Sequence, residues 1–319
     1  MNGPARRVCS VVVPVYRNED TLADLLDRLG ALAAALPVEL RCVFVVDGSP
    51  DRSAEVLAKA LDGWEVPSTL VVLSRNFGSF AAIRAGLARA RGDYFAVMAA
   101  DLQEPPELLV SFVELLERGD VDLVLGERTG RDDPLAARAG AAAFWGIYRR
   151  IVQPEMPPGG VDVFACNDAV RSAILAMHES NTSLVGQLLW IGFRRATVPY
   201  RRLARPSGRS AWTTRKKLRY MADSVFSFTD LPIRVLLAVG TLGTVLIPVI
   251  GAVVLAAWLL GAIDVPGYTP LMLAVLLVGG IVTLGLGVVG SYVWRTFENT
   301  KGRPLVIEQA VREFPGGRP

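Results

Sequence analysis

Two uncharged apolar stretches decide the architecture of this chain: 235-VLLAVGTLGTVLIPVIGAVVLAAWLLGAI-263 and 269-TPLMLAVLLVGGIVTLGLGVVGSYVW-294. Neither stretch contains Asp, Glu, Lys, Arg or His. Each exceeds the roughly 20 residues that a helix needs to cross a ~30 Å hydrocarbon core. A short loop, Asp264–Tyr268, joins them. The sequence therefore predicts two transmembrane helices that form a hairpin at residues 232–296.

Basic residues flank this predicted hairpin on one side. No acidic residue occurs between Glu179 and Asp223, a stretch rich in Arg and Lys, and Arg295 and Lys301 follow the second apolar stretch. By the positive-inside rule, both termini are expected in the cytoplasm, on a multi-pass protein of the inner cell membrane. The same cations would attract anionic membrane lipids. A nucleic-acid site is not expected so close to a bilayer.

The N-terminal region has no features of a signal peptide. Residues Met1–Arg7 are polar, and the next apolar run, Val8–Val15, is too short and ends next to a proline. The first part of the chain is therefore expected to stay in the cytoplasm. The three cysteines lack the spacing of metal ligands, so buried free thiols are expected.

Strand-like and helix-like patterns alternate through the first half of the chain. We predict strands at residues 8–15, 40–46, 70–73, 94–99 and 121–125, with helices at 21–36, 52–61, 79–90 and 106–117. Such alternation is typical of an α/β fold with a mostly parallel sheet and helices on both faces. In these folds, ligands bind beyond the carboxyl ends of the strands.

Polar residues follow each of the five predicted strands. They are Tyr16 and Glu19, then Asp47, then Asn76 and Gly78, then Asp101 and Gln103, and finally Arg128 and Arg131. A turn or a helix cap would explain any one of these groups, but not all five together. The sequence therefore predicts one ligand site at the carboxyl edge of the sheet.

The pattern is looser after residue 133. We predict strands at 161–166 and 196–200 and helices at 135–150, 169–177 and 184–191. A helix at 213–231 is basic at its start and apolar on one side, which fits either an interfacial helix at the membrane surface or packing on the soluble domain. The expected domains are 1–212, a cytoplasmic α/β domain; 213–231, a juxtamembrane helix; 232–296, the hairpin; and 297–319, a cytoplasmic tail.

Small residues recur at every fourth position in both predicted membrane helices. The first has Gly240, Thr244, Pro248, Ala252 and Ala256, and the second has Gly279, Thr283, Gly287 and Ser291. Small residues at this spacing allow helices to approach closely in lipid. Either packing within the hairpin or packing between subunits of a homo-oligomer would satisfy the pattern.

Five motifs, in this order, resemble those of the inverting family-2 polyprenyl-phosphate glycosyltransferases, which include dolichyl-phosphate mannose synthase and the bactoprenol glucosyltransferases. They are VPVYRNE at 13–19, VDGS at 46–49, LSRNFG at 73–78, DLQEPPE at 101–107 and GRSAW at 208–212. Each motif is weak alone, whereas the ordered set is specific. The two-helix tail matches one branch of that family.

This resemblance implies a GT-A (nucleotide-diphospho-sugar transferase) fold that binds a UDP- or GDP-linked sugar. The donor-binding residues that it implies are Pro14, Tyr16, Glu19, Asp47, Asn76, Gly78 and Arg131. Asp101 and Gln103 would hold a Mg²⁺ or Mn²⁺ ion on the donor diphosphate. A hard dication suits this task because it offsets the charge that develops on the leaving group. Stabilisation by arginine alone is the alternative.

The resemblance also implies an acceptor site. Asp162 matches the acidic residue near the acceptor, where it would orient the acceptor, act as a base or be structural; with Asp101 and Arg128 it forms the candidate catalytic set. The residues expected to hold the prenyl phosphate or the donor phosphates are Arg205, Ser210, Trp212 and Lys216. Arginine suits bidentate contacts with phosphate. The implied reaction is transfer of one sugar to a polyprenyl phosphate, with inversion.

Two positions depart from the family pattern. Ala99 stands where the family has the first carboxylate of Asp-x-Asp, and Val46 replaces the first acid of Asp-Asp-Gly-Ser. An ion would then rely on Asp101, Gln103, water and the donor phosphates. Ala99 motivates a second hypothesis, a catalytically inactive scaffold that binds nucleotide or lipid at the membrane. A processive polysaccharide synthase is disfavoured because QLLW at 187–190 is not the Gln-x-x-Arg-Trp motif of those enzymes.

Overall fold

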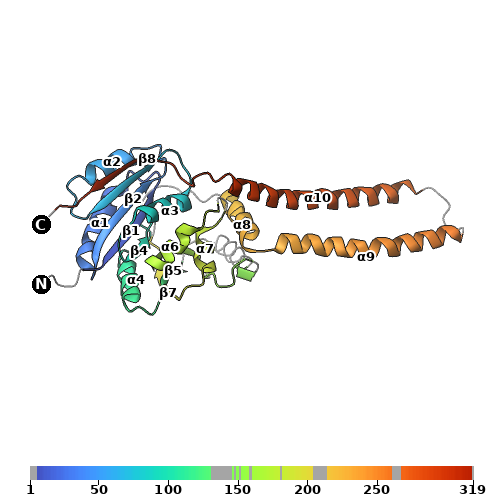
Figure 1. The fold of residues 1–319 in the computed structure, drawn as a ribbon, viewed down its shortest axis with the longest axis horizontal. Helices are drawn as coiled ribbons and strands as arrows, with labels where there is room; N and C mark the ends of the chain where they lie inside the picture. The colour runs from blue at the N-terminus through green and yellow to red at the C-terminus, as the bar shows by residue number, and fades with distance from the viewer. Residues whose placement is uncertain are drawn as a thin grey trace. The chain divides into compact units, whose positions relative to one another are not determined.

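The computed structural model describes residues 6–130, 146, 149–150, 152–157, 160–179, 182–203, 214–260 and 267–317. The chain divides into two compact units. Residues 1–218 and 303–319 form the first unit, and residues 219–302 form the second. Strands and helices alternate along the first unit, whereas the described part of the second is helical (Figure 1).

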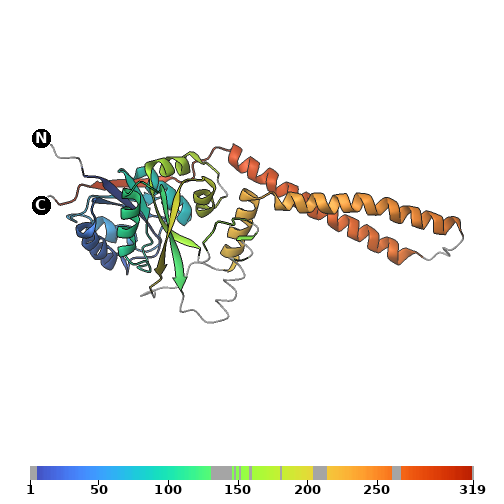
Figure 2. The ribbon, with the colours of Figure 1, turned by 90° about the horizontal axis from the view of Figure 1, so that it is seen from below.

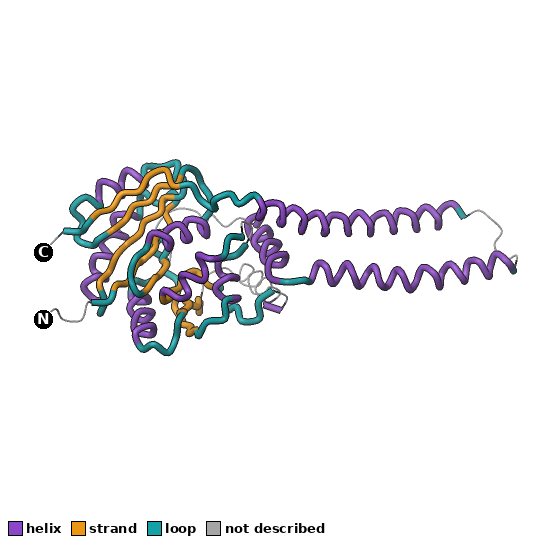
Figure 3. The backbone as a smooth tube through the Cα atoms, viewed as in Figure 1, coloured by secondary structure: helices purple, strands orange, loops and turns teal. Residues whose placement is uncertain are grey.

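An eight-stranded sheet runs through the first unit in the order β7-β5-β6-β4-β1-β2-β3-β8. Figure 3 shows its strands in orange with helices packed around them. Its strands are β1 (Val8–Val15), β2 (Glu39–Val46), β3 (Ser68–Leu73), β4 (Tyr94–Val97), β5 (Leu123–Gly130), β6 (Val161–Asn167), β7 (Arg195–Arg201) and β8 (Glu308–Phe314). The central strands β4, β1, β2 and β3 are parallel to one another, and β5 is parallel to β7. Strands β6 and β8 pair antiparallel with their neighbours. The expected α/β fold with a mostly parallel sheet is confirmed.

Helices connect the strands of the first unit. They are α1 (Leu22–Ala35), α2 (Ser53–Ala60), α3 (Ser79–Arg89), α4 (Glu107–Glu117), α6 (Asp168–Ala176) and α7 (Leu184–Trp190). All six lie within a residue or two of the helices that the sequence predicts. The helix expected at 135–150 lies almost entirely outside the described residues.

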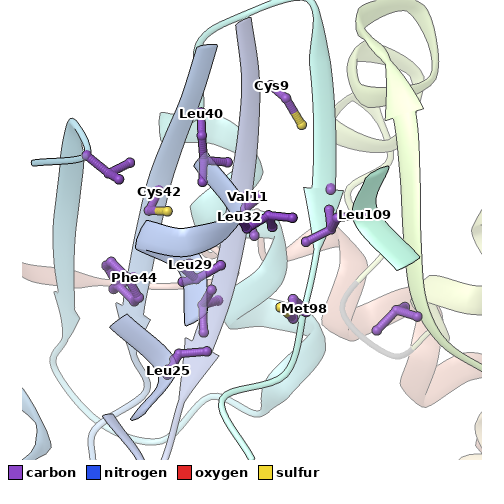
Figure 4. Packing of buried hydrophobic residues seen from close by; sticks show 14 of the residues in the cluster. Cys9, Val11, Leu25, Leu29, Leu32, Leu40, Cys42, Phe44, Met98 and Leu109 are labelled. Carbon is purple, nitrogen blue, oxygen red and sulfur yellow. The ribbon is translucent and has the colours of Figure 1, made fainter. Parts of the chain in front are cut away.

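Both faces of the central strands are buried, which explains why β1 reads as an apolar run rather than an alternating one. Val11 and Val13 belong to a cluster with α1 and α4, and Figure 4 shows Leu29 and Leu32 of α1 beside Val11. Val12 points to the opposite face, where α3 lies very close. A Cβ added to Gly86 of α3 would stand 2.2 Å from Cγ1 of Val12. Only glycine fits there.

Strand β8 was not predicted, because its sequence, EQAVREF, is short and mostly polar. It pairs antiparallel with β3 and therefore returns part of the expected tail to the sheet of the first unit. Arg89 of α3 forms an ion pair with Glu308, and the N–H of Ser74 donates to the carbonyl of Ile307 at 2.9 Å. The N–H of Gly317 donates to the carbonyl of Trp64 at 3.1 Å. Residues 303–317 are thus an integral part of the first unit.

Three helices make up the described part of the second unit and its entry: α8 (Thr214–Phe228), α9 (Leu231–Leu259) and α10 (Tyr268–Thr300). Among the described residues, one helix, Leu277–Thr300, is long and apolar enough to cross a membrane. A pair of helices, Met221–Phe228 and Leu231–Leu242, bent by 74°, passes the same test together. Figure 2 shows α9 and α10 as two long helices whose paths cross in that view.

Polar and aromatic contacts join α8 to the end of α10 within the second unit. The Arg295 guanidinium lies 2.7 Å from a carboxylate oxygen of Asp223 and 5.1 Å from the centre of the Phe226 ring. Phe226 packs edge-on against Tyr292, with ring centroids 5.3 Å apart. These contacts hold α8 against the end of α10.

Among the described residues, a contact between α10 and α9 lies at Gly285, which is outside the expected stripe of small residues. At the α9 contact, a Cβ added to Gly285 would lie 3.0 Å from Leu236, whereas additions at Gly279 or Gly287 would meet no described atom within 4 Å. The hydroxyl of Thr283 donates back to the carbonyl of Gly279 at 2.8 Å. Packing of this stripe, within the hairpin or between subunits, stays a prediction.

Candidate active site

Asp47 ties the loop after β2 to the loop after β3. Its buried carboxylate accepts hydrogen bonds from the N–H of Phe77 at 2.7 Å and of Gly78 at 2.9 Å. The amide of Asn76 donates to the carbonyl of Asp47 at 3.2 Å. Burial raises the pKa of Asp47, and the two N–H donors act in the opposite direction by favouring the carboxylate. Three predicted donor-binding residues, Asp47, Asn76 and Gly78, are therefore in mutual contact.

Gly48 allows these two loops to approach each other. Its φ is +55°, and a Cβ at this position would stand 2.2 Å from the carbonyl carbon of Arg75. Any other residue would meet both a strained backbone conformation and a direct clash with the neighbouring loop. The glycine of the VDGS motif is thus required by the close contact of the loops.

The loop after β1 interlocks with the loop after β2. The N–H of Arg17, a residue with a φ of +57°, donates to the hydroxyl of Ser49 at 2.8 Å. Glu19 accepts from the N–H of Arg52 at 2.9 Å. Tyr16 is 37% exposed at this edge, and Pro14 lies one residue before the end of β1. Tyr16 and Glu19 therefore lie at the carboxyl edge of the sheet, as predicted.

The loop after β4 carries the two predicted metal ligands. Leu102, between them, has a φ of +59°, and the N–H of Gln103 donates to the Asp101 carboxylate at 3.3 Å. The Gln103 amide nitrogen donates to the carbonyl of Leu203, just after β7, at 3.2 Å. The N–H of Leu203 donates to the carbonyl of Gln103 at 2.8 Å. These bonds anchor the Asp101 loop to the end of β7.

An ion cluster joins the ends of four strands beside this loop. Arg202 stands among three carboxylates: its guanidinium lies 3.7 Å from Asp101, 4.0 Å from Glu104 and 4.0 Å from Asp162. Arg128, on β5, contacts Asp162 at 3.1 Å. The structure thus brings the three predicted catalytic residues, Asp101, Asp162 and Arg128, into one cluster. Arg202 is the link between Asp101 and Asp162.

Burial dominates the electrostatics of this cluster. Glu104 is 2% exposed, and neither of its carboxylate oxygens has a hydrogen-bond partner among the described residues. Burial, followed by the negative charge of Asp101, raises the pKa of Glu104 to about 8. Burial also raises the pKa of Tyr200, whose hydroxyl donates to Asp162 at 3.4 Å. The cluster is therefore a charged, partly buried site in which Asp162, with a third of its side chain exposed, is the most accessible acid.

Sequence reasoning missed three members of the cluster, Glu104, Tyr200 and Arg202. Glu104 belongs to the DLQEPPE motif, but a carboxylate just before a helix is usually a cap or a favourable charge at the helix N-terminus. Tyr200 lies near the end of β7 and Arg202 just beyond it, among many other basic residues. The only sequence signal for them was the change from apolar to basic residues at the end of that strand.

Several predicted residues lie outside the described part of the chain. These are Arg131, Arg205, Ser210 and Trp212, and Lys216 falls in α8 at a position whose side chain is not described. Their roles stay predictions.

The oxygen donors at this edge are suited to a hard cation. Among the described residues, no group of three or more His, Cys, Asp or Glu side chains is arranged to hold a metal ion. The Asp101 carboxylate and the Gln103 amide nevertheless lie on one loop and provide the oxygen ligands that Mg²⁺ and Mn²⁺ prefer. Mg²⁺ normally keeps several waters and takes further ligands from substrate phosphates. The donor set fits such an ion.

Comparisons with known proteins identify the family of the chain. Residues 10–176 match the family described as glycosyl transferase family 2. An uncharacterised glycosyltransferase from Synechocystis is 31% identical over 299 residues, which cover 93% of either chain. The undecaprenyl-phosphate 4-deoxy-4-formamido-L-arabinose transferase from Pseudomonas paraeruginosa is 33% identical over 316 residues, covering 97% of this chain and 92% of the relative.

Solved structures are more distant. The mannosyl-3-phosphoglycerate synthase from Rubrobacter xylanophilus has a TM-score of 0.48 and 19% identity, over 69% of this chain and 72% of that one. The match with the family covers more than half of the chain, and it includes the loops that carry Asp47 and Asp101. The chain belongs to glycosyl transferase family 2.

Proposed function

We propose that this glycosyltransferase moves one sugar from a UDP- or GDP-linked donor to a polyprenyl phosphate at the cytoplasmic face of the cell membrane. The observation that carries the proposal is the cluster of Asp101, Asp162 and Arg128 at the carboxyl edge of the sheet. Relatives that match nearly the whole chain are named for transfer to undecaprenyl phosphate, which supports the choice of acceptor.

The donor would bind across the first three loops. Pro14, Tyr16 and Glu19 would contact the nucleoside, and the linked loops of Asp47, Asn76 and Gly78 would shape its pocket. The loops are preorganised because each is held by hydrogen bonds to its neighbour. Preorganisation of this kind lowers the cost of ordering the site when the donor binds. Arg131 would complete the donor contacts.

The diphosphate would lie beside Asp101 and Gln103. A Mg²⁺ or Mn²⁺ ion held there would offset the negative charge that develops on the leaving diphosphate. Arg128 and Arg202 add positive charge fixed by the protein at the same edge. Fixed charges in a partly buried site act strongly because they need no reorganisation during the reaction.

The acceptor phosphate oxygen would attack the anomeric carbon from the face opposite the diphosphate. The bond between that carbon and the diphosphate oxygen breaks, its electron pair leaves with the diphosphate, and the configuration inverts. A prenyl phosphate already carries negative oxygens at neutral pH, so Asp162 would mainly orient the acceptor. Its contacts with Arg128 and Tyr200 hold it for that task. Arg205, Ser210, Trp212 and Lys216 would bind the acceptor phosphate.

The helices of the second unit supply the membrane part of the proposal. We infer that both α9 and α10 span the bilayer, with both termini in the cytoplasm and with 213–231 as a juxtamembrane helix. Most described side chains of α9 and α10 are apolar and exposed, as lipid-facing residues are. The basic flanks would then meet anionic lipid.

Because Ala99 replaces the first carboxylate of the family pattern, a second function has to be tested. This alternative is an inactive scaffold that binds nucleotide or lipid. The structure offers a reason to favour the enzyme, because Asp101 keeps two further carboxylates and two arginines close by. A degenerate site would have no need for such a buried charged cluster, since buried charges are costly unless they are used or well paired.

The test is sugar transfer by the purified full-length chain in vesicles. The chain is incubated with Mn²⁺, undecaprenyl phosphate and a panel of radiolabelled UDP- and GDP-sugars, and organic-phase label is counted. We expect label with at least one donor and loss of at least about 100-fold in Asp101→Ala, the size typical of a lost electrostatic group. Exposed Asp62→Ala is the matched control and should keep full activity. Nucleotide binding without transfer would instead establish the scaffold.

A further inference from the structure

Arg202 has an unusual environment for an arginine. Its side chain is 18% exposed, and its guanidinium is shared by three carboxylates at 3.7 to 4.0 Å, so that none holds it at hydrogen-bond distance. Its Nε is buried and has no hydrogen-bond partner among the described residues. A guanidinium can donate five hydrogen bonds. Arg202 is thus held by charge rather than by a defined set of hydrogen bonds.

The location of Arg202 matters because Asp101 is one of the carboxylates that it shares. Asp101 is the carboxylate expected to hold the divalent ion, and the position two residues earlier in the chain is Ala99 rather than an acid. Any cation that binds Asp101 must therefore approach a positive guanidinium 3.7 Å from that carboxylate. Like charges at such distances repel strongly at the partly buried edge of a protein.

We propose that Arg202 is a built-in counter-cation that makes binding of the divalent ion depend on the nucleotide donor. In the free enzyme, Arg202 neutralises Asp101 and keeps the affinity for Mg²⁺ or Mn²⁺ low. The donor diphosphate supplies negative charge that balances both the divalent ion and the Arg202 guanidinium. The ion therefore binds together with the donor. The inference rests on the proposed metal role of Asp101 and Gln103, and it assigns Arg202 as a positioning residue.

The arrangement also determines which groups still contact Arg202 after Asp101 binds the ion. Asp162 lies 4.0 Å from the same guanidinium, so Arg202 keeps a carboxylate partner when Asp101 turns to the ion. Glu104 is buried 4.0 Å from the same guanidinium, and because burial raises its pKa to about 8 we count no fixed negative charge on it. The charge of Arg202 therefore stays in the site during the whole cycle.

The test measures Mn²⁺ affinity of the full-length protein in detergent, by calorimetry, without nucleotide and with saturating UDP or GDP. Wild type should bind Mn²⁺ weakly alone and at least about tenfold more tightly with one nucleotide, as expected when a charge of opposite sign is added nearby. Arg202→Gln should bind Mn²⁺ alone at least about tenfold more tightly than wild type. Arg202→Lys, which keeps the charge, should resemble wild type.

The matched control is Arg201→Gln, which removes the same charge from the exposed neighbouring position of β7. It should leave Mn²⁺ affinity within about twofold of wild type, since an exposed charge is screened by solvent. If Arg202→Gln does not fold, Arg202→Met replaces it, and the rise in melting temperature caused by Mn²⁺ alone is compared with wild type. That rise should be larger in the variant because binding stabilises the folded state.

Two outcomes separate this inference from the proposed function. Nucleotide-dependent Mn²⁺ binding by wild type, with equal or weaker binding by the Arg202→Gln and Arg202→Met variants, would overturn the role of Arg202 and leave the metal role of Asp101 intact. Absence of Mn²⁺ binding in every protein, even with nucleotide, would overturn both.

Discussion

At the scale of single residues, Asp47 shows how one carboxylate organises a donor loop. Both of its oxygens accept backbone N–H bonds from the loop after β3, and it lies next to Gly48, where only glycine fits. The motif VDGS is therefore a structural unit as much as a binding one. Val46, which stands in place of the first acid of the family pattern, is buried in β2 and takes no part in these hydrogen bonds.

We expect Asp47→Ala to destabilise the protein by about 1–3 kcal/mol, because two N–H groups lose their acceptor. Asp47→Asn keeps one acceptor oxygen and should cost less. The measurements are thermal unfolding in detergent and the affinity for UDP and GDP. The substitution of exposed Glu55 in α2 by Ala is the control, and it should change neither. An Asp47→Ala protein with unchanged stability would contradict the loop-holding role.

A second prediction at this scale concerns the pair Arg128 and Asp162, which are 3.1 Å apart. In a double-mutant cycle of Arg128→Gln and Asp162→Asn, kcat/KM should show a coupling of about 0.5–3 kcal/mol, the range for residues in one charged network. Asp120→Asn, at an exposed position, provides the uncoupled control with Arg128→Gln. Additive effects of the two substitutions would mean that the ion pair does not act in catalysis.

The sequence predicted some of this cluster and missed the rest for a physical reason. Asp101 and Arg128 each follow a strand that the sequence predicts, so their position along the chain indicates the sheet edge, and Asp162 was found through the family resemblance. Arg202 and Tyr200 enter the site only because β7 pairs in parallel with β5, next to Arg128. Pairing between strands so far apart in the chain leaves no local pattern in the sequence.

At the scale of elements, the most informative one is β8. Its polar, exposed sequence is typical of an irregular tail, and it forms a strand because it pairs with β3. The strands at the centre of the sheet were predicted well because burial on both faces makes them continuous apolar runs. An edge strand carries no such signal, since one of its edges and most of its side chains face water.

Gly316, just beyond β8, gives a test of that element. Its φ is +78°, and a Cβ there would stand 2.7 Å from the carbonyl oxygen of Glu65. Gly316→Ala should therefore destabilise the β8 end by about 1–3 kcal/mol through backbone strain and contact. Gly317→Ala is the matched control, because its Cβ would meet nothing closer than 3.9 Å. Hydrogen exchange of the β3 and β8 amides measures the difference, and equal protection in both variants would count against the packing.

At the scale of the whole molecule, the proposed topology can be tested through the cysteines. Cys9, Cys42 and Cys166 are buried, and burial raises the pKa of the Cys9 thiol to about 12 and those of the other two in the same direction. Since the thiolate is the reactive form, these native thiols should give little background labelling. A cysteine introduced elsewhere can therefore report which side of the membrane it faces.

If both α9 and α10 span the membrane, Asp264→Cys should react with an impermeant maleimide applied to intact cells. Asp62→Cys, at an exposed position of the first unit, should react only after the membrane is opened. The positive-inside rule gives this direction. Labelling of both positions from outside, or of neither, would refute a cytoplasmic catalytic domain on a two-helix anchor.

Strand β8 also has a consequence for biosynthesis. It follows both apolar helices along the chain, whereas its partner β3 precedes them. The ribosome must therefore deliver the two hydrophobic segments before the sheet can be completed, and until then one side of β3 stays unpaired. An open strand edge invites association with other nascent chains. Slow insertion into the bilayer should thus expose a newly made catalytic domain to aggregation for longer.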